Sequence, residues 1–357
     1  MGDLVSYGGD LKIIAIRNEI QRVQQNLLAA GHTISSELEF TDFVSAPLSR
    51  IAVAMQWPTI NQKLQQLLAA CDFAAKQYFD GEALIAKEIM DVNIAPVIAG
   101  SIALVGGSLG LFHETDGLAR EVKKPFRVSA PQSLADLTKR VQFLDDGNLP
   151  RVQIEKYGNK FVVAIPGTQT WNPIALANPL DFTSNLGSMK SPNTAASERS
   201  VLDAMRKAGI GRGSQVLFVG HSQGGLVAAN IAVTRPREFS VAGVVTLGAP
   251  IAHLEKRLSV PTISLQHKND LVPKLGVKAN PMAENWVTVM REARIKPDAN
   301  ALIEAHEISN YKKTAELADK STEPGVSRIR DRIVSFIGAN RGDEKIGWAK
   351  TFELLRR

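Results

Sequence analysis

A serine between glycines is the first candidate for chemistry in this sequence, because residues 216–230 are VLFVGHSQGGLVAAN. The apolar run 216–219 is typical of a buried strand, and a helix-like apolar run begins at residue 226. Ser222 would then lie on a sharp turn from strand to helix, where larger neighbours would collide with adjoining backbone. Such a turn exposes the hydroxyl and places the N–H groups of the helix start beside it. The pattern predicts a nucleophilic serine; a plain glycine-rich turn is the alternative.

The partners of the serine follow from the order of residues along the chain. A serine hydroxyl is a weak nucleophile and needs a histidine base, which needs a carboxylate to hold it. In hydrolases with a strand-serine-helix turn, the acid and then the histidine follow the serine. The run 262–266 predicts a strand ending shortly before Asp270, and of the six histidines only His306 follows Asp270. We therefore predict a triad of Ser222, Asp270 and His306.

Other partners for the serine remain open. His253 and His267 also follow Ser222, but each would need an acid earlier in the chain, where no predicted strand end supplies one. Ordinary loop histidines are the simpler interpretation of both. The competing acids, none of which follows a predicted strand so closely with turn residues after it, are Glu284, Glu292, Asp298 and Glu304.

An oxyanion hole needs backbone N–H donors from two places. One comes from the residue after the nucleophile, here Gln223. The other is expected from the end of an earlier strand, and the run 161–165 ends in Pro166, Gly167 and Thr168. We expect Thr168 to supply this second donor, with a plain turn as the alternative.

Two patterns divide the chain near residue 128. Residues 11–91 have apolar side chains at helical spacing, which predicts a hairpin or small bundle with its turn at residues 56–58. From residue 129, short apolar strands alternate with helices. The strands are expected at 152–157, 160–165, 215–219, 241–247, 262–266 and 286–290, and the helices at 195–208, 222–234 and 301–319. This alternation predicts a doubly wound, mostly parallel α/β sheet in residues 129–357, preceded by a helical N-terminal domain in residues 1–128.

The segment 92–112 has no charged residue but contains four glycines and a proline. A transmembrane helix is one interpretation of such a length. The glycines favour a buried or interfacial segment instead, because they interrupt a helix and permit close packing. We expect the second arrangement, which would still allow contact with a membrane surface.

Charge and cysteine content exclude several classes of site. The formal net charge of +6 divides into −3 for residues 1–130 and +9 for residues 131–357. The basic part could favour an anionic lipid surface or acidic substrates, but no basic block interleaved with aromatics indicates nucleic acid. A single cysteine, Cys71, excludes an intramolecular disulfide and a cysteine metal site. The sequence HEISN at 306–310 lacks the second histidine of a zinc-binding helix, so we expect neither a metal nor a cofactor.

Several blocks in residues 130–320 occur in the order of a known family. They are Gly167-Thr168, LDFTSNL at 180–186, GHSQGG at 220–225, TLGAP at 246–250, NDLVP at 269–273, and His306 with Tyr311. Their order resembles the class 3, or fungal-type, lipases of the α/β-hydrolase fold. The resemblance implies an oxyanion loop at Gly167-Thr168 and an apolar lid near residues 170–180. The chain departs from the family's pattern at Pro166 and Gln223, where the family has arginine and leucine.

The N-terminal part resembles, more distantly, the helical-hairpin proteins exported by type VII secretion. Trp57 lies where their Trp-x-Gly turn would be, and residues 78–82, YFDGE, fit their Tyr-x-x-x-Asp/Glu signal. The resemblance implies a secretion partner for these helices. The first residues, MGDLVSYGGD, lack the pattern of a classical signal peptide. The location is therefore open between export to the cell envelope or beyond by a type VII-like route and the cytoplasm.

Together these residues predict a serine hydrolase that cleaves carboxylic esters, lipid esters among them. A thioesterase or an acyltransferase would use the same triad, since the sequence does not show which acceptor takes the acyl group. The alternative from another class is a noncatalytic hydrolase fold that serves as a scaffold for a secretion or membrane partner. The presence of all three triad residues in order favours the enzyme.

Overall fold

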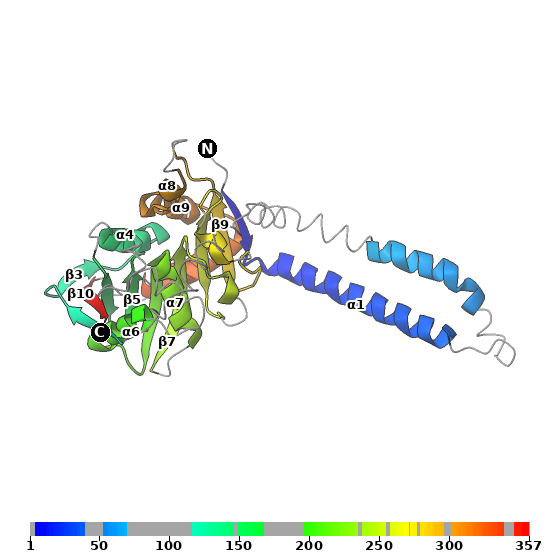
Figure 1. Ribbon diagram of the computed structural model, residues 1–357, viewed down its shortest axis with the longest axis horizontal. Helices are drawn as coiled ribbons and strands as arrows, with labels where there is room; N and C mark the ends of the chain where they lie inside the picture. Colours follow the sequence, from blue (N-terminus) through cyan, green and yellow to red (C-terminus); the bar gives the residue numbers. More distant parts are fainter. Residues whose placement is uncertain are drawn as a thin grey trace, which may run out of the picture. The chain divides into compact units, whose positions relative to one another are not determined.

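The computed structural model describes residues 4–39, 53–69, 116–145, 149–167, 196–234, 238–254, 258–270, 272–276, 279–295, 301–338 and 346–356. The chain divides into two compact units, one formed by residues 10–87 and the other by Met1–Gly9 with Glu88–Arg357. The larger unit is mixed α/β, with a ten-stranded, partly parallel sheet in its described residues (Figure 1).

The sheet of the larger unit is parallel at its centre and antiparallel toward its edges. The strand order is β1-β9-β8-β7-β6-β5-β4-β10-β2, and β3 also pairs with β10. The parallel strands are β5 (Lys160–Ile165), β6 (Ser214–His221), β7 (Phe239–Leu247), β8 (Thr262–His267) and β9 (Trp286–Arg291). The antiparallel strands are β1 (Val5–Gly8), β2 (Gly117–Glu121), β3 (Phe126–Ser129), β4 (Arg151–Tyr157) and β10 (Ile346–Arg356).

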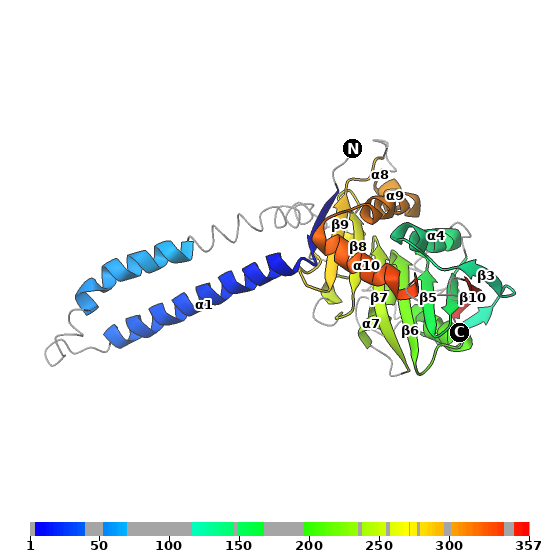
Figure 2. The same ribbon diagram turned by 180° about the vertical axis from the view of Figure 1, so that it is seen from behind.

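Helices cover both faces of this sheet because its central strands are apolar on both sides. Phe161 and Val163 pack with α6 (Ala196–Lys207) and α7 (Gln223–Thr234) on one face. Val162 and Ala164, which alternate with them, pack on the other face with α4 (Leu134–Asp145), α9 (Ile308–Asp319) and α10 (Pro324–Gly338). Figure 1 shows α7 in front of the strands, and Figure 2 shows α10 in front of them from the opposite side.

The six strands expected from the sequence are present, with ends shifted by at most two residues. The hairpin about Gly158 is also confirmed, since β4 and β5 are antiparallel and Gly158 has φ 63°. The prediction of a mostly parallel sheet is correct only for the centre. One expected helix, 301–319, is interrupted at Glu307, whose extended backbone separates α8 (Ala301–His306) from α9. The sheet also takes in β1 and β2, which precede the boundary expected at residue 128.

The smaller unit contains two described helices, α1 (Leu11–Glu39) and a helix over residues 53–69. They pack together, because a Cβ on Gly31 of α1 would lie 2.6 Å from Leu64 Cδ2. The turn predicted at residues 56–58 is wrong, since the second helix runs through them.

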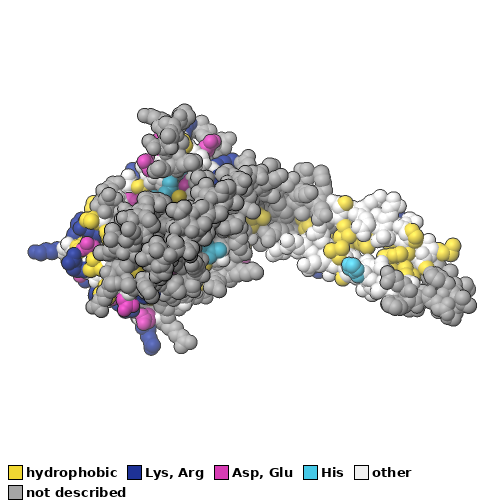
Figure 3. All heavy atoms as spheres, viewed as in Figure 1, with side chains coloured by type: hydrophobic (Ala, Val, Ile, Leu, Met, Phe, Trp, Pro, Cys, Tyr) yellow, Lys and Arg dark blue, Asp and Glu magenta, His cyan; other side chains and the backbone are white. Residues whose placement is uncertain are grey.

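Both helices of the smaller unit expose large apolar side chains, as the yellow areas of Figure 3 show. They include Val23, Leu28, Val53, Met55 and Leu67. Within the part of the chain that is described, no helix has the length and apolar character needed to cross a bilayer. The predictions for Cys71, residues 78–82 and residues 92–112 lie outside the described residues.

Candidate active site

The turn around Ser222 has the sharp geometry expected of a nucleophile. Ser222 separates β6 from α7 and has φ 51°, the only positive φ among the described residues other than glycine. Its backbone N–H donates to the carbonyl of Leu247 at 2.8 Å. A Cβ on Gly220 would collide with the carbonyl oxygen of Gly224, and one on Gly224 with that of Pro166. The glycines are therefore required for strand, turn and helix to pack this closely.

Asp270 and His306 are brought together although 36 residues separate them. His306 Nδ1 lies 2.6 Å from Asp270 Oδ2, and the Tyr311 hydroxyl donates to the same oxygen at 2.5 Å. The N–H of Val272 donates to Asp270 Oδ1 at 2.9 Å. Burial raises the pKa of the Asp270 carboxyl, but the imidazole and these donors lower it by more, so the net pKa lies below its usual value. Asp270 is therefore ionised at neutral pH.

The contacts of His306 leave one of its ring nitrogens available as an acceptor. Since Asp270 accepts from Nδ1, that nitrogen carries the proton and Nε2 is the free acceptor. Nε2 is buried and has no hydrogen-bond partner in the described part of the chain. Burial lowers the pKa of His306, and although Asp270 opposes this effect the net pKa stays below the usual value. A neutral imidazole with an unused, buried acceptor is able to take a proton from a nearby hydroxyl.

The site residues lie at the same edge of the sheet because the parallel strands that carry them point the same way. Ser222 follows β6, Asp270 follows β8, and Gly167 follows β5. Loops after the carboxyl ends of parallel strands are where such folds place binding and catalytic groups. His306 reaches this edge from α8, which follows β9 in the chain.

His267, an alternative base, has a different role. Its Nδ1 lies 2.7 Å from the carbonyl oxygen of Ala305, and its Nε2 lies 2.7 Å from Thr314 Oγ1. Its ring stacks on Tyr311 at 4.0 Å between centroids, and burial lowers its pKa to about 4. It is thus a neutral residue that supports Tyr311. The other alternative, His253, lies in the short 3₁₀ turn Ala252–Leu254.

The expected oxyanion donors lie in part outside the described residues. Gln223 is the buried first residue of α7, where helix N–H groups have no acceptor within the helix. Thr168 lies outside the described residues, but Gly167 before it is described. A Cβ on Gly167 would lie 2.9 Å from His221 Nδ1 and 3.2 Å from Ser222 Cβ. The end of β5 therefore contacts the serine turn. The lid expected near residues 170–180 also lies outside the described residues.

A second histidine-carboxylate pair, which the sequence did not indicate, adjoins the first. His221 Nδ1 lies 2.8 Å from Asp145 Oδ2, and the N–H of Gly167 donates to Asp145 Oδ1 at 2.9 Å. The His221 ring stacks on His306 with 4.7 Å between centroids. Asp145 ends α4, a helix absent from the expected elements, so no local signal pointed to it.

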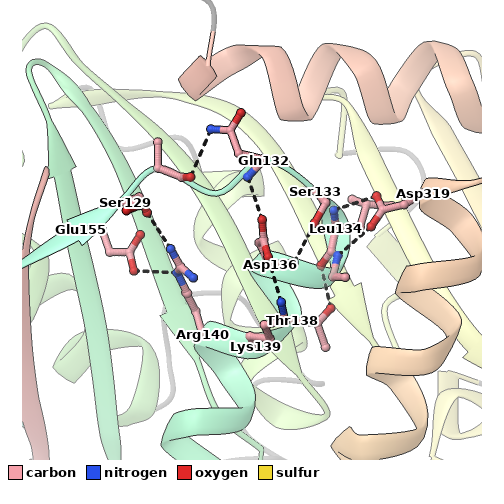
Figure 4. Close-up of polar contacts among 12 residues, drawn as sticks. Ser129, Gln132, Ser133, Leu134, Asp136, Thr138, Lys139, Arg140, Glu155 and Asp319 are labelled. Atoms are coloured by element: carbon pink, nitrogen blue, oxygen red, sulfur yellow. Dashed lines mark hydrogen bonds and ion pairs between the residues drawn. The ribbon is translucent and has the colours of Figure 1, made fainter. Parts of the chain in front are cut away.

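Polar contacts anchor the helix that carries Asp145 (Figure 4). At its start, the N–H groups of Leu134 and Ala135 donate to the two oxygens of Asp319, the last residue of α9, at 2.8 and 3.0 Å. Arg140 Nε donates to the buried Glu155 Oε1 at 3.0 Å, which ties α4 to β4. These contacts fix the position of α4 against the sheet, and with it the position of the Asp145 carboxylate at the end of the helix.

The described residues contain no group of three or more His, Cys, Asp or Glu side chains placed to hold a metal ion. What the arrangement provides is a serine on a strained turn, a neutral buried imidazole oriented by a carboxylate, and a helix start behind the serine.

Comparison with models of known protein families, with curated proteins and with solved structures finds no significant match.

Proposed function

We propose that this protein is a serine hydrolase of the α/β-hydrolase type that cleaves carboxylic esters, and that lipid esters are among its substrates. The observation that carries the proposal is the Asp270–His306 pair at the sheet edge where the strained Ser222 lies, since the buried Nε2 of His306 has no hydrogen-bond partner among the described residues. A scaffold has no need for a buried acceptor without a partner, which is unfavourable unless a ligand or a reaction uses it.

In this mechanism Ser222 Oγ attacks the carbonyl carbon of the ester while His306 Nε2 takes the hydroxyl proton. The C=O bond electrons move to the oxygen, and Asp270 stabilises the imidazolium that forms. The oxyanion then collapses, the C–O bond to the alcohol breaks, and His306 returns the proton to the leaving alcohol. Water, activated by the same imidazole, hydrolyses the acyl-serine and regenerates the hydroxyl.

Backbone N–H groups stabilise the oxyanion in this proposal. Gln223 supplies one from the start of α7, and Thr168 supplies the other from the loop after β5. One such donor contributes about 10²–10³ in kcat in related chemistry. Ser222 Oγ is not hydrogen-bonded to His306 in the described residues; catalytic bonds of this kind are often long in the free enzyme and shorten with substrate bound.

The lipid preference rests on the resemblance to class 3 lipases, and the departures at Pro166 and Gln223 make short esters alternative substrates. Contact of a membrane with residues 92–112 or with the basic residues of the larger unit, and a secretion partner for the helical unit, belong to the same proposal. The exposed apolar side chains of α1 and residues 53–69 favour a partner for those helices.

The test is hydrolysis of p-nitrophenyl esters of increasing chain length by the full chain, with Ser222→Ala as the control. A fluorophosphonate label should attach to Ser222, as located by mass spectrometry. Long-chain esters in micelles distinguish a lipase from an esterase, and added alcohol or thioester reveals an acyltransferase or a thioesterase. Folded wild-type protein with neither turnover nor labelling refutes the proposal.

A further inference from the structure

Both ring nitrogens of His221 face hydrogen-bond acceptors. Nδ1 lies 2.8 Å from Asp145 Oδ2, and Nε2 lies 2.9 Å from the backbone carbonyl oxygen of His306. A carbonyl oxygen cannot donate, and a neutral imidazole carries only one N–H. With Asp145 ionised, both contacts are hydrogen bonds only when the ring carries two protons. The geometry thus favours an imidazolium at His221.

Asp145 has the environment of an ionised carboxylate. Its Oδ2 faces His221, and its Oδ1 accepts the N–H of Gly167 at 2.9 Å. Burial raises the pKa of Asp145, but the charge and hydrogen bond of His221 and the N–H of Gly167 bring it below the usual value. The exposed side-chain fractions of His221 and Asp145 are 7% and 16%, so little water screens the pair.

The groups facing His221 come from several elements. Asp145 comes from α4 and His306 from α8, while the Tyr311 ring of α9 is 5.7 Å away and the Asp270 carboxylate follows β8. Burial lowers the pKa of His221, but Asp145, the His306 carbonyl and Asp270 raise it by more, to a net value above the usual one. Charge and hydrogen-bond geometry therefore agree.

The pair joins four segments that are distant in sequence. Gly167, held by Asp145, precedes the expected oxyanion donor Thr168. His221 precedes the nucleophile, and its second bond fixes the backbone of His306, on whose ring it stacks at 4.7 Å. Loss of Asp145 would release the N–H of Gly167, and loss of His221 would release the backbone carbonyl of His306.

We propose that Asp145 and a protonated His221 form a buried ion pair that positions Gly167, the residue before the expected oxyanion donor, relative to Ser222 and the general base His306. Both are positioning residues, since neither contacts the reacting atoms in the proposed mechanism. The role in catalysis rests on the proposed function, whereas the charge of His221 does not.

The ion pair also affects the protonation of His306, which is faced by Asp270, His221, Asp145, Tyr311 edge-on and the neutral His267. A cation at His221 lowers the pKa of His306, and the carboxylates of Asp270 and Asp145 raise it. His221→Gln would leave the Asp145 charge uncompensated beside His306. We expect the acidic limb of the kcat/KM profile to move up by about one pH unit in this variant. In Asp145→Asn both charges are lost, because His221 becomes neutral, so the limb should move less.

The first experiment reads the charge of His221 without using activity. In ¹⁵N-histidine-labelled full chain, long-range ¹⁵N–¹H spectra distinguish an imidazolium from the two neutral tautomers, and His221→Gln identifies the His221 signals. We expect an imidazolium at pH 7.5 that becomes neutral in Asp145→Asn. A neutral His221 in the wild type overturns the proposal, whether or not the protein hydrolyses esters.

The second experiment tests positioning through kinetics. Asp145→Ala removes the acceptor of the Gly167 N–H, whereas Asp145→Asn keeps one, so we expect a fall in kcat of about 10²-fold for the first and a smaller fall for the second, with little change in KM. Asp136→Asn is the matched control, because Asp136 lies at the opposite end of α4 and pairs with Lys139 nearer the surface. Circular dichroism and the fluorophosphonate-reactive fraction of Ser222 separate slower catalysis from unfolding.

The two proposals fail in different ways. An active wild type and an inactive Ser222→Ala, combined with wild-type kcat and an unshifted pH profile in folded His221→Gln and Asp145→Ala, overturn the positioning role alone. An inactive, unlabelled wild type refutes the proposed hydrolase and with it the catalytic role, and the spectra then decide whether the ion pair exists.

Discussion

Replacing Tyr311 by Phe removes the hydroxyl that donates to Asp270 Oδ2 at 2.5 Å. The ring can remain in place, because it stacks on His267 at 4.0 Å between centroids. Tyr311 and Asp270 are both fully buried, so water does not readily replace the lost donor. A hydrogen bond to a charged group contributes about 1.5–3 kcal/mol. We expect Tyr311→Phe to lower the free energy of unfolding by about 2 kcal/mol at pH 7.

The effect of this substitution should depend on pH with a defined sign. The folded pKa of Asp270 lies below its unfolded value near 3.8, so its charge contributes stability above that pH, and this contribution is lost as the pH falls through the folded pKa. The Tyr311 hydroxyl is one source of the lowered pKa. The loss caused by Tyr311→Phe is therefore complete at pH 7 and shrinks below about pH 4.

Urea unfolding of four proteins measures the interaction: wild type, Tyr311→Phe, Asp270→Asn and the double variant. The double-mutant cycle isolates the coupling between hydroxyl and carboxylate, which we expect to exceed about 1 kcal/mol. A loss below about 0.5 kcal/mol for Tyr311→Phe, or full additivity with Asp270→Asn, refutes the reasoning that a buried charged hydrogen bond holds the acid.

Three further predictions concern other contacts of the larger unit. Arg140→Met should lower the free energy of unfolding, measured in urea, by about 3–5 kcal/mol, because it leaves the buried Glu155 without its cation. Adding Glu155→Gln to the Arg140→Met chain should recover part of this loss. Gly224→Ala should abolish ester hydrolysis and fluorophosphonate labelling, since its Cβ would collide with the Pro166 carbonyl. Gly211→Ala should retain both activities, because a Cβ there meets nothing within 4 Å. Activity should fall on acidification with a midpoint below pH 6.5, because burial lowers the pKa of His306 and the base must be neutral; a midpoint above 6.5 in the pH profile contradicts this assignment.

Residues close in sequence carried the predictions that were confirmed. The turn at Ser222 was recognisable because its glycines, strand and helix lie within fifteen residues, and the backbone permits few conformations there. The central strands were recognisable because strands buried on both faces are continuous apolar runs. Asp270 was selected for its position after such a run, and the order of the chain left His306 as its partner; the contact between the two is present, and their catalytic roles stay a prediction.

Strands and helices with mixed patterns were not recognised. β10 carries charged residues among apolar ones, and it forms a strand because β4 on one side and β2 and β3 on the other supply hydrogen-bond partners. The turn expected at residues 56–58 was wrong because Pro58, which indicates a break locally, lies inside the helix over residues 53–69.

The sequence by itself thus determined the strained serine turn, the central strands and the order of Ser222, Asp270 and His306 along the chain. Only the tertiary structure decided that His221 faces Asp145, 76 residues away, and that both of its ring nitrogens meet acceptors. It also decided the protonation of His306, which depends on burial and on charges from α4, β6 and the loop after β8. The physical reason is that local patterns reflect backbone sterics and hydrophobic burial, whereas charge states depend on desolvation and neighbours that folding alone brings together.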